Sequence, residues 1–423
     1  MTKKILANHK PKLRWPINIE YSEIEGQKAV VLSDKWGIAS KPAAFPSSLL
    51  PVIARFDGEN SIADIALQGR NYGITVELVT QLVEALYQLQ FLEAEDVRVK
   101  WRELKEKYRT IGVRKEALAG TIYPQDPKVL RRVLDDYIAR SKTTVLDSDF
   151  CKKAIGFIAP HIDYTRGWQT YGAGFAALKQ TARPDVIFLF GTSHQPGEGF
   201  FSLTDKDFST PLGIVPVHEA TLATVLSKYG RDRALCDEIL HRDEHSIELQ
   251  LPFLMHCYSN GGCPPIVPIL VGSFHEFLRG DGLPTTSSEV EDFIGIVADT
   301  VNNLRREGKK VLFYAGVDFA HVGRHFGDRE PMDRKSLAEL EARDGELIRS
   351  ILSGKSASVF AHVASDLDRR RICGFPSLYS MLSIMEYAGI EATGECIEYR
   401  QAVEEKSDCT VSFASILLRE KTC

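Results

Sequence analysis

The chain has 423 residues, of which 44% are hydrophobic and 26% are charged, and its formal net charge is −5. This length favours two or three domains, and this composition is typical of a globular protein with a large core. The negative balance excludes a bulk basic field for nucleic acid or a membrane surface, and the eight cysteines form no CxxC pair. No apolar run has the length of a signal peptide or a transmembrane helix, so we expect a cytoplasmic protein that binds no nucleic acid and no membrane.

Residues 1–100 are expected to form a small helical domain with short strands. Residues 28–34 predict a strand, and Ser61 followed by Asp64 predicts a helix start with a capping box. The next helix has one apolar face, which is formed by Val79, Leu82, Val83, Leu86 and Leu89. Phe91 and Leu92 would then begin a hairpin wing, as in a winged helix. The helices are acidic or neutral, which favours recognition of a partner or peptide over DNA; the alternative is that the apolar face packs on the rest of the chain.

Residues 101–115 predict a charged linker helix, and from residue 116 strands alternate with helices. The predicted strands are 152–160, 184–191, 263–272 and 309–318. The helical stretches between and after them lie near 168–180, 216–229, 288–307 and 334–353. This order predicts an α/β domain over residues 116–423, with a mainly parallel sheet covered by helices on both faces. The last two strands are expected to pair antiparallel at one side.

Titratable residues follow three of these strands. His161 comes directly after Pro160, His194 follows "FLFGTS", and Asp318 and His321 follow "LFYAG". Ligands of open α/β sheets bind beyond the carboxyl ends of the strands, so these side chains should meet at one edge. A single histidine at such a place is more often a loop residue or a supporting residue than a ligand. For His161 alone the two interpretations are balanced, and the convergence with His194 favours a metal site.

Two helix starts add further candidates. Cys373 precedes a Gly-Phe-Pro-Ser helix start, where the positive end of the helix dipole favours a thiolate. The alternative for Cys373 is a buried structural cysteine. Glu244, His245 and Glu248 lie in the first turn of a helix whose expected N-cap is Asp243. We interpret His245 and Glu248 as support for metal ligands rather than as ligands.

Seven motifs occur in order over residues 116–423. They are "AGTIYP" (119–124), "APHIDYTRGWQTYG" (159–172), "GTSH" (191–194), "DEHSIELQLPFL" (243–254), "VPILVG" (267–272), "DFAHVG" (318–323) and "ICGFPSL" (372–378). Together they resemble the Memo family, whose bacterial members are named AmmeMemoRadiSam system protein B. The sheet fold of that family is similar to that of the class III extradiol ring-cleaving dioxygenases, which use non-haem iron. The N-terminal stretch "LLPVIARFDGENSIADIA" resembles PqqD-like winged-helix domains, which present peptides to modifying enzymes.

The resemblance implies a role for each candidate residue. His161, His194 and Cys373 would contact the metal, and Asp318 and His321 would serve catalysis beside it. The residues expected to support the metal or to meet the substrate are Asp163, Tyr164, Glu244, His245 and Glu248. The usual "PHAGY" of the family reads "PHIDY" here, so Asp163 is expected to add a carboxylate to the site.

Three classes of function are compatible with these residues. Two imidazoles and a thiolate suit one first-row metal, Fe(II) in preference to Cu or Zn, and three protein ligands leave positions open for catalysis. The first class is therefore a dioxygenase-like non-haem iron oxidoreductase that acts on an unidentified small molecule, with His321 as acid–base and a radical-SAM partner system. The second is a non-catalytic metal-holding scaffold for protein or peptide binding through the N-terminal domain. The third is a metal-free Cys373–histidine hydrolase.

Overall fold

The computed structural model describes residues 6–24, 26–141, 144–280 and 282–421. The chain divides into two compact units, Met1–Thr110 and Ile111–Cys423, each with its own hydrophobic core. Within the described residues, no helix combines the length and the apolar character that crossing a membrane would need.

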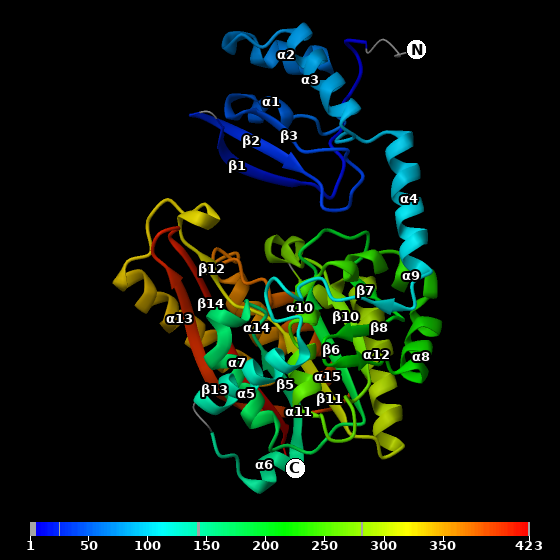
Figure 1. Ribbon diagram of the computed structural model, residues 1–423, viewed down its shortest axis with the longest axis vertical. Helices are drawn as coiled ribbons and strands as arrows, with labels where there is room; N and C mark the ends of the chain where they lie inside the picture. Colours follow the sequence, from blue (N-terminus) through cyan, green and yellow to red (C-terminus); the bar gives the residue numbers. More distant parts are fainter. Residues whose placement is uncertain (1–5, 25, 142–143, 281, 422–423) are drawn as a thin grey trace. The chain divides into compact units, whose positions relative to one another are not determined.

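The first unit begins with a small antiparallel sheet (Figure 1). Its strands pair in the order β1 (Asn18–Ile24), β2 (Gln27–Ser33) and β3 (Ala43–Pro46). The helices that follow are α1 (Leu50–Ile53), α2 (Ile62–Gly69) and α3 (Val76–Gln88). The capping box of Ser61 and Asp64 is confirmed at the start of α2. Most of the predicted apolar face of α3 is buried, from Val79 to Leu86.

In the fully described stretch 86–100, no hairpin wing follows α3, so the structure does not support the winged-helix interpretation. Leu92 pairs with Leu13 in an isolated bridge, and the backbone N–H of Arg14 donates to the carbonyl of Phe91. Phe91 and Leu92 are both buried, and the N-terminal segment supplies their strand-like neighbour. The chain then enters α4 (Glu95–Arg109) directly.

The linker helix predicted for residues 101–115 is only partly correct, because α4 ends at Arg109. Val113 and Arg114 form a short strand, β4 (Val113–Arg114), which pairs in parallel with β8 (Asp207–Thr210) of the second unit. The second unit therefore begins at Ile111 rather than at residue 116. The physical reason is Arg114, whose buried guanidinium forms an ion pair with the buried carboxylate of Glu248.

A mixed sheet forms the centre of the second unit, in the order β12-β14-β5-β11-β6-β10-β7 with β13 paired to β14. The strands joined in parallel are β5 (Ala154–Ala159), β11 (Val311–Gly316), β6 (Val186–Thr192) and β10 (Ile266–Val271). The strands joined by antiparallel pairing are β7 (Phe201–Leu203), β12 (His321–Val322), β13 (Ala392–Glu404) and β14 (Cys409–Glu420). The α/β class is thus confirmed, but the sheet is less parallel than predicted, because the C-terminal hairpin inserts β14 beside β5.

Helices pack on both faces of this sheet (Figure 1). They are α5 (Pro127–Arg140), α6 (Ser148–Lys153), α7 (Tyr164–Leu178), α8 (Glu219–Tyr229), α9 (Arg231–Leu235), α10 (His245–Glu248), α11 (Leu251–Cys257), α12 (Ser288–Arg306), α13 (Arg334–Leu352), α14 (Ser356–Ala364) and α15 (Phe375–Tyr387). On one face, Phe157 of β5 packs on Phe175 of α7, which stacks on Phe253 of α11. On the other face, Phe188 and Phe313 belong to a core shared with α8, α12 and α15. A separate small sheet joins β4, β8 and β9 (Gly213–Val215).

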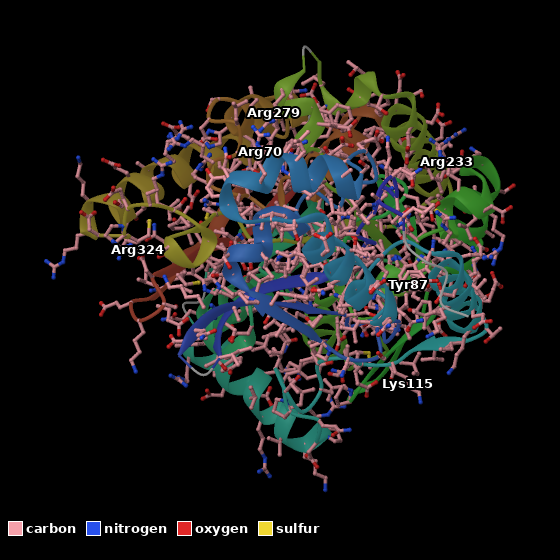
Figure 2. The ribbon with its side chains drawn as sticks, turned by 90° about the horizontal axis from the view of Figure 1, so that it is seen from above. Arg70, Tyr87, Lys115, Arg233, Arg279 and Arg324 are labelled. Atoms are coloured by element: carbon pink, nitrogen blue, oxygen red, sulfur yellow. The ribbon has the colours of Figure 1, made fainter. Side chains whose placement is uncertain are left out.

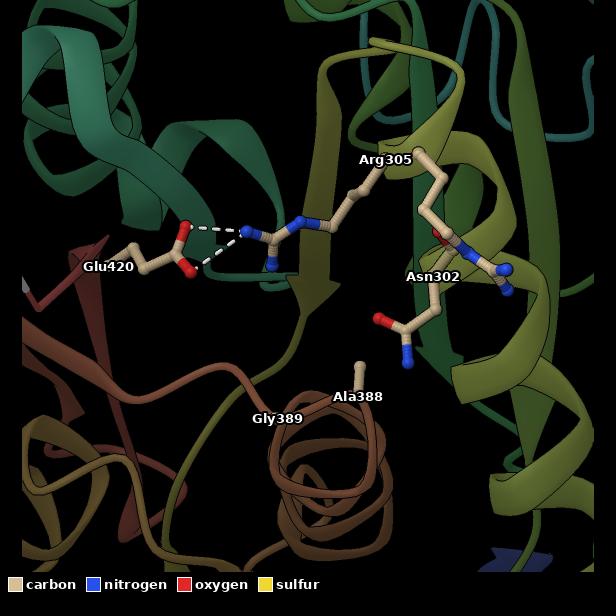
Figure 3. Close-up of a pocket in the computed structure, with 6 residues that line it drawn as sticks. Asn302, Arg305, Ala388, Gly389 and Glu420 are labelled. Atoms are coloured by element: carbon tan, nitrogen blue, oxygen red, sulfur yellow. Dashed lines mark hydrogen bonds and ion pairs between the residues drawn. The ribbon is translucent and has the colours of Figure 1, made fainter.

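The two ends of the parallel strands differ in character. At the amino end, Arg305 of α12 donates two hydrogen bonds of 2.8 Å to the carboxylate of Glu420 on β14, beside a pocket (Figure 3). This pair links α12 to the sheet.

Charged side chains on the outside of the second unit, such as Arg233 and Arg324, are exposed (Figure 2). Among the described residues, one cluster of three imidazoles occurs, and two of its members follow the carboxyl ends of β5 and β6.

Candidate metal centre

The central strands end at the same level, which brings their following loops together. Gly316, the last residue of β11, pairs with Ala159 of β5 on one side and with Gly191 of β6 on the other. His161 lies two residues beyond the end of β5, and His194 lies two residues beyond the end of β6. The register of the sheet therefore delivers both imidazoles to one edge.

A third histidine completes this cluster. The ligand atoms of His161, His194 and His245 all lie within 4.8 Å of one another. The rings of His194 and His245 stack with their centroids 4.4 Å apart, and the centroid of His161 lies 5.0 Å from that of His194. His245 was expected to support the ligands, whereas the structure places its ring among them. No sequence pattern fixes this position, because it depends on where α10 docks on the sheet.

Each of the three imidazoles has its Nδ1 atom occupied by an acceptor. Nδ1 of His161 lies 3.0 Å from the carbonyl oxygen of Gly316. Nδ1 of His194 and Nδ1 of His245 lie 2.9 and 3.1 Å from the same atom, Oε1 of Glu244. Histidines that bind metals are commonly held in this way, with one nitrogen bonded to a carbonyl or carboxylate and the other offered to the metal. The arrangement makes Nε2 the nitrogen that each ring can offer.

Glu244 joins two of the histidines to the start of α10. Its carboxylate accepts from the backbone N–H groups of His245 at 2.8 Å and Ser246 at 3.1 Å, and from that of His194 at 3.0 Å. Burial alone would raise the pKa of this carboxyl, but the adjacent His194 and His245 hold the pKa well below its ordinary value. Glu244 is thus the N-cap of α10, in place of the expected Asp243, whose carboxylate pairs with Arg242.

Cys373 lies beside the cluster rather than within it. Its Sγ atom is 3.2 Å from Nε2 of His161, and among the described residues the set within 4.8 Å of one another holds the three histidines alone. Gly374 allows this approach, since a Cβ atom there would lie 2.5 Å from Cβ of Val317. The helix dipole was expected to favour a thiolate. Instead, burial and the neighbouring Asp318 raise the pKa of the Cys373 thiol well above its ordinary value.

Asp318 and His321, which were expected to serve catalysis beside the metal, come from one loop, but each side chain has its own partners. Oδ1 of Asp318 accepts from the backbone N–H groups of His161 and Ile162, and Oδ2 lies 3.8 Å from Nε2 of His161. Burial raises the pKa of Asp318 to about 7. Nδ1 of His321 lies 3.2 Å from the carbonyl oxygens of Phe319 and Arg371, and burial lowers the pKa of this imidazole to about 4.

The donor set fits a first-row transition metal. A metal shared by an imidazole nitrogen and a thiolate sulfur would hold these atoms about 3.5 Å apart, from bond lengths of about 2.0 and 2.3 Å at a tetrahedral angle. The observed separation of Nε2 of His161 and Sγ of Cys373 is 3.2 Å. Imidazole and thiolate donors suit Fe(II), Cu or Zn rather than Mg or Ca.

Comparison with known proteins decides the family. A family model described as Memo-like protein matches residues 114–417. The chain belongs to the Memo family. A MEMO1 family protein of Aquifex aeolicus is 28% identical over 411 residues, which cover 96% of this chain and 99% of that protein. A relative of Thermus thermophilus is 25% identical over 82% of this chain and 96% of its own length.

The N-terminal unit is shared by only part of these Memo relatives. A MEMO1 family protein of Methanosarcina barkeri is 28% identical over 310 residues, which are 100% of its own length and 72% of this chain. Its aligned length is close to that of the Memo region, whereas the Aquifex aeolicus alignment extends over the N-terminal unit as well. The first unit is therefore an addition to a Memo domain that also occurs without it.

Three other predicted residues of this Memo protein stabilise the surroundings of the site. Asp163 caps α7 by accepting from the backbone N–H of Arg166 at 3.1 Å, and it also accepts from the Arg166 side chain. The carboxylate that Asp163 was expected to add is thus engaged by Arg166. Tyr164 is buried and donates its hydroxyl to the carbonyl of Leu249 at 2.6 Å. Glu248 accepts from Arg114 and, at 2.6 Å, from the hydroxyl of Tyr123.

Sequence reasoning missed Arg114 and the double role of Glu244. Arg114 stands in a charged stretch that has the composition of a solvated helix, and only the apolar residues Ile111 and Val113 before it indicate a strand. Its guanidinium also donates to the carbonyls of His241 and Glu244, each at 2.9 Å. Arg114 therefore fixes the segment from which the cap of α10 is built.

Proposed function

We propose that this Memo protein is a metalloprotein whose single first-row transition metal, Fe(II) in preference to Cu or Zn, is held by His161, His194 and Cys373, with His245 as a fourth donor. The observation that carries the proposal is the convergence of three oriented imidazoles beside a thiol. One ring nitrogen from each histidine lies within 4.8 Å of the others, and Sγ of Cys373 is 3.2 Å from Nε2 of His161. Such a centre keeps room for a further ligand, because these metals also accept five or more donors.

The favoured activity is a dioxygenase-like oxidation of a small molecule. When bound, the metal would supply a Lewis acid and, as Fe(II) or Cu, a one-electron redox centre. Burial lowers the pKa of His321 to about 4, so the imidazole is neutral near pH 7 and would act there only as a weak base at Nε2. Asp318, with a pKa of about 7, can hold or release a proton at Oδ2 beside His161. Each of these two groups would exchange protons on its own, without a hydrogen bond to the other.

A metal-holding scaffold is the second candidate, and the separate N-terminal unit favours it. Met1–Thr110 has its own core, which includes Val30, Ile53 and Val83, and the described part of it holds none of the metal-binding cluster. In this proposal the unit recruits a protein or peptide, with a radical-SAM protein as the partner class that the family resemblance implies. A metal-free Cys373–His161 hydrolase ranks below both, since burial raises the pKa of the thiol and disfavours the nucleophilic thiolate.

Metal analysis after anaerobic purification tests the proposed centre. The full chain should carry, or take up on reconstitution with Fe(II), one metal per molecule. His161→Ala and His194→Ala should lose most of it, because each removes a donor of the cluster. His325→Ala is the matched control, since His325 is exposed in a short 3-10 helix close in sequence to His321. A wild-type chain that binds no metal under these conditions would contradict the proposal.

A further inference from the structure

Gln250 is a buried polar residue that joins two of the loops of the proposed metal centre. It lies directly before α11, and its side chain is fully buried. Its amide nitrogen donates at 3.0 Å to the carbonyl of Pro160, the residue before His161. The same nitrogen donates at 3.0 Å to the carbonyl of Ser246, the residue after His245. One NH₂ group therefore connects the backbone beside two of the imidazoles.

Ser246 extends this connection to the third histidine. Its hydroxyl donates at 2.8 Å to the carbonyl of Thr192, the last residue of β6, which lies two residues before His194. Ser246 is fully buried, and it packs so closely on β6 that a Cβ atom at Gly191 would lie 2.6 Å from its Oγ atom. Gln250 and Ser246, which we call the neutral clamp, thus reach the loops of all three imidazoles through backbone carbonyls.

The other end of the Gln250 amide is held by β11. The hydroxyl of Tyr314 donates to Oε1 of Gln250 at 2.6 Å, and Tyr314 is fully buried. These partners give the amide one orientation, since its NH₂ group faces two carbonyls and its oxygen faces a hydroxyl. The neutral clamp is therefore an ordered part of the core, and its hydrogen bonds hold fixed positions.

We infer that Gln250 is a positioning residue that fixes the separation of His161 and His245 and thereby makes His245 a ligand of the metal. The inference rests on the proposed metal centre. The bond of Gln250 to Pro160 crosses from the end of α10 to the loop after β5. It therefore sets the distance between the rings of His161 and His245, whose centroids lie 5.1 Å apart. Because α10 is a single turn of four residues, its place on the sheet depends on such links. A shift of about 0.5 Å is enough to impair a metal site.

The competing interpretation is that Gln250 only contributes to stability. Its loss would leave the hydroxyl of Tyr314 and two carbonyls buried without these partners, which lowers stability whether or not a metal binds. Tyr314→Phe separates the two roles, because it removes one hydrogen bond of the amide but keeps both bonds to the carbonyls. A purely structural role predicts that Gln250→Met and Tyr314→Phe both lose stability and both keep the metal affinity of the wild type.

The test measures Co(II) binding by the full chain, through competition with a chelator and through the visible spectrum of the bound ion, which reports the number and arrangement of its ligands. Gln250→Met should weaken Co(II) binding by about tenfold or more and change the visible bands. Tyr314→Phe is the matched control and should bind Co(II) with the affinity and the spectrum of the wild type. Ser246→Ala removes only the bond to Thr192 and should cause a smaller loss of affinity.

The effect of Gln250→Met should also depend on His245. In a His245→Ala background, Gln250→Met should weaken Co(II) binding no further, since the ligand that it positions is already absent. Persistence of the full loss in that background would overturn the inference, and so would wild-type Co(II) affinity in Gln250→Met or, if that variant does not fold, in Ser246→Ala. A wild-type chain that takes up no Co(II) overturns the proposed function together with the inference, whereas the other outcomes overturn the inference alone.

Discussion

At the scale of single residues, Glu244 contributes to the site in two ways. One carboxylate oxygen orients the rings of both His194 and His245, and the same side chain caps α10. The negative charge of the carboxylate stabilises the N–H donors around both of its oxygens, whereas an amide has one accepting oxygen and would turn its NH₂ group toward an N–H donor. Charge and geometry therefore both require glutamate at this position.

We predict that Glu244→Gln weakens metal binding by about 10- to 100-fold, the usual cost of losing a hydrogen-bond partner of a metal ligand. Metal affinity is measured by competition with a chelator, and the fold is checked by circular dichroism. Asp333→Asn is the matched control, since Asp333 caps α13 through the N–H of Ser336 and touches no imidazole. Metal affinity equal to that of the wild type in Glu244→Gln would show that the bridge to His194 and His245 has no role in binding.

At the scale of secondary-structure elements, the sequence predicts the strand ends well. Strands β5, β6 and β11 form where apolar runs predict them. The loops that follow their carboxyl ends carry His161, His194 and Asp318. This success has a physical cause: buried parallel strands are continuous apolar runs, and their carboxyl ends meet at one edge.

The elements that the sequence misplaces depend on contacts between distant residues. Arg114 and Glu248 are 134 positions apart, and no local sequence pattern predicts their ion pair. The wing predicted after α3 fails for the same reason, because Leu92 finds its strand partner in Leu13. The place of His245 follows from the docking of α10 against the ends of β6 and β11, a tertiary contact that periodicity does not encode.

The docking of α10 requires glycine at position 316. A Cβ atom there would lie 2.5 Å from the carbonyl oxygen of Ser246 and 2.7 Å from Nε2 of Gln250. We predict that Gly316→Ala lowers the free energy of unfolding by about 1–3 kcal/mol, the usual cost of overpacking, and reduces metal binding by displacing His245. Urea denaturation and metal analysis measure the two effects. Gly295→Ala is the control, because α12 has open space there, and metal loss in both variants would contradict the explanation.

At the scale of the whole molecule, the boundary between the two units lies between Thr110 and Ile111. Chain starts on either side of Arg114 should therefore behave differently. A chain that begins at Ile111 keeps β4 and the ion pair of Arg114 with Glu248. A chain that begins at Glu116 leaves the Glu248 carboxylate buried without its cation.

We predict that residues 111–423 fold alone and bind metal as the full chain does, whereas residues 116–423 are less stable by about 3–5 kcal/mol, the usual cost of removing one partner of a buried pair. Thermal unfolding and metal content are the measurements. Precipitation or metal loss of residues 111–423 would mean that the N-terminal unit belongs to the core fold, and the scaffold proposal would lose its main support.

The absorption spectrum of the cobalt-loaded full chain shows whether Cys373 binds the metal, because a cobalt–thiolate bond gives a charge-transfer band in the near ultraviolet. We expect one Co(II) per chain and this band in the wild type. The band should disappear in Cys373→Ala and persist in Cys263→Ala, where the mutated cysteine is buried elsewhere. His245→Ala should keep the band but bind Co(II) much more weakly than the wild type. A wild-type spectrum without the thiolate band, or full cobalt affinity in His245→Ala, would contradict a centre built from these imidazoles and Cys373.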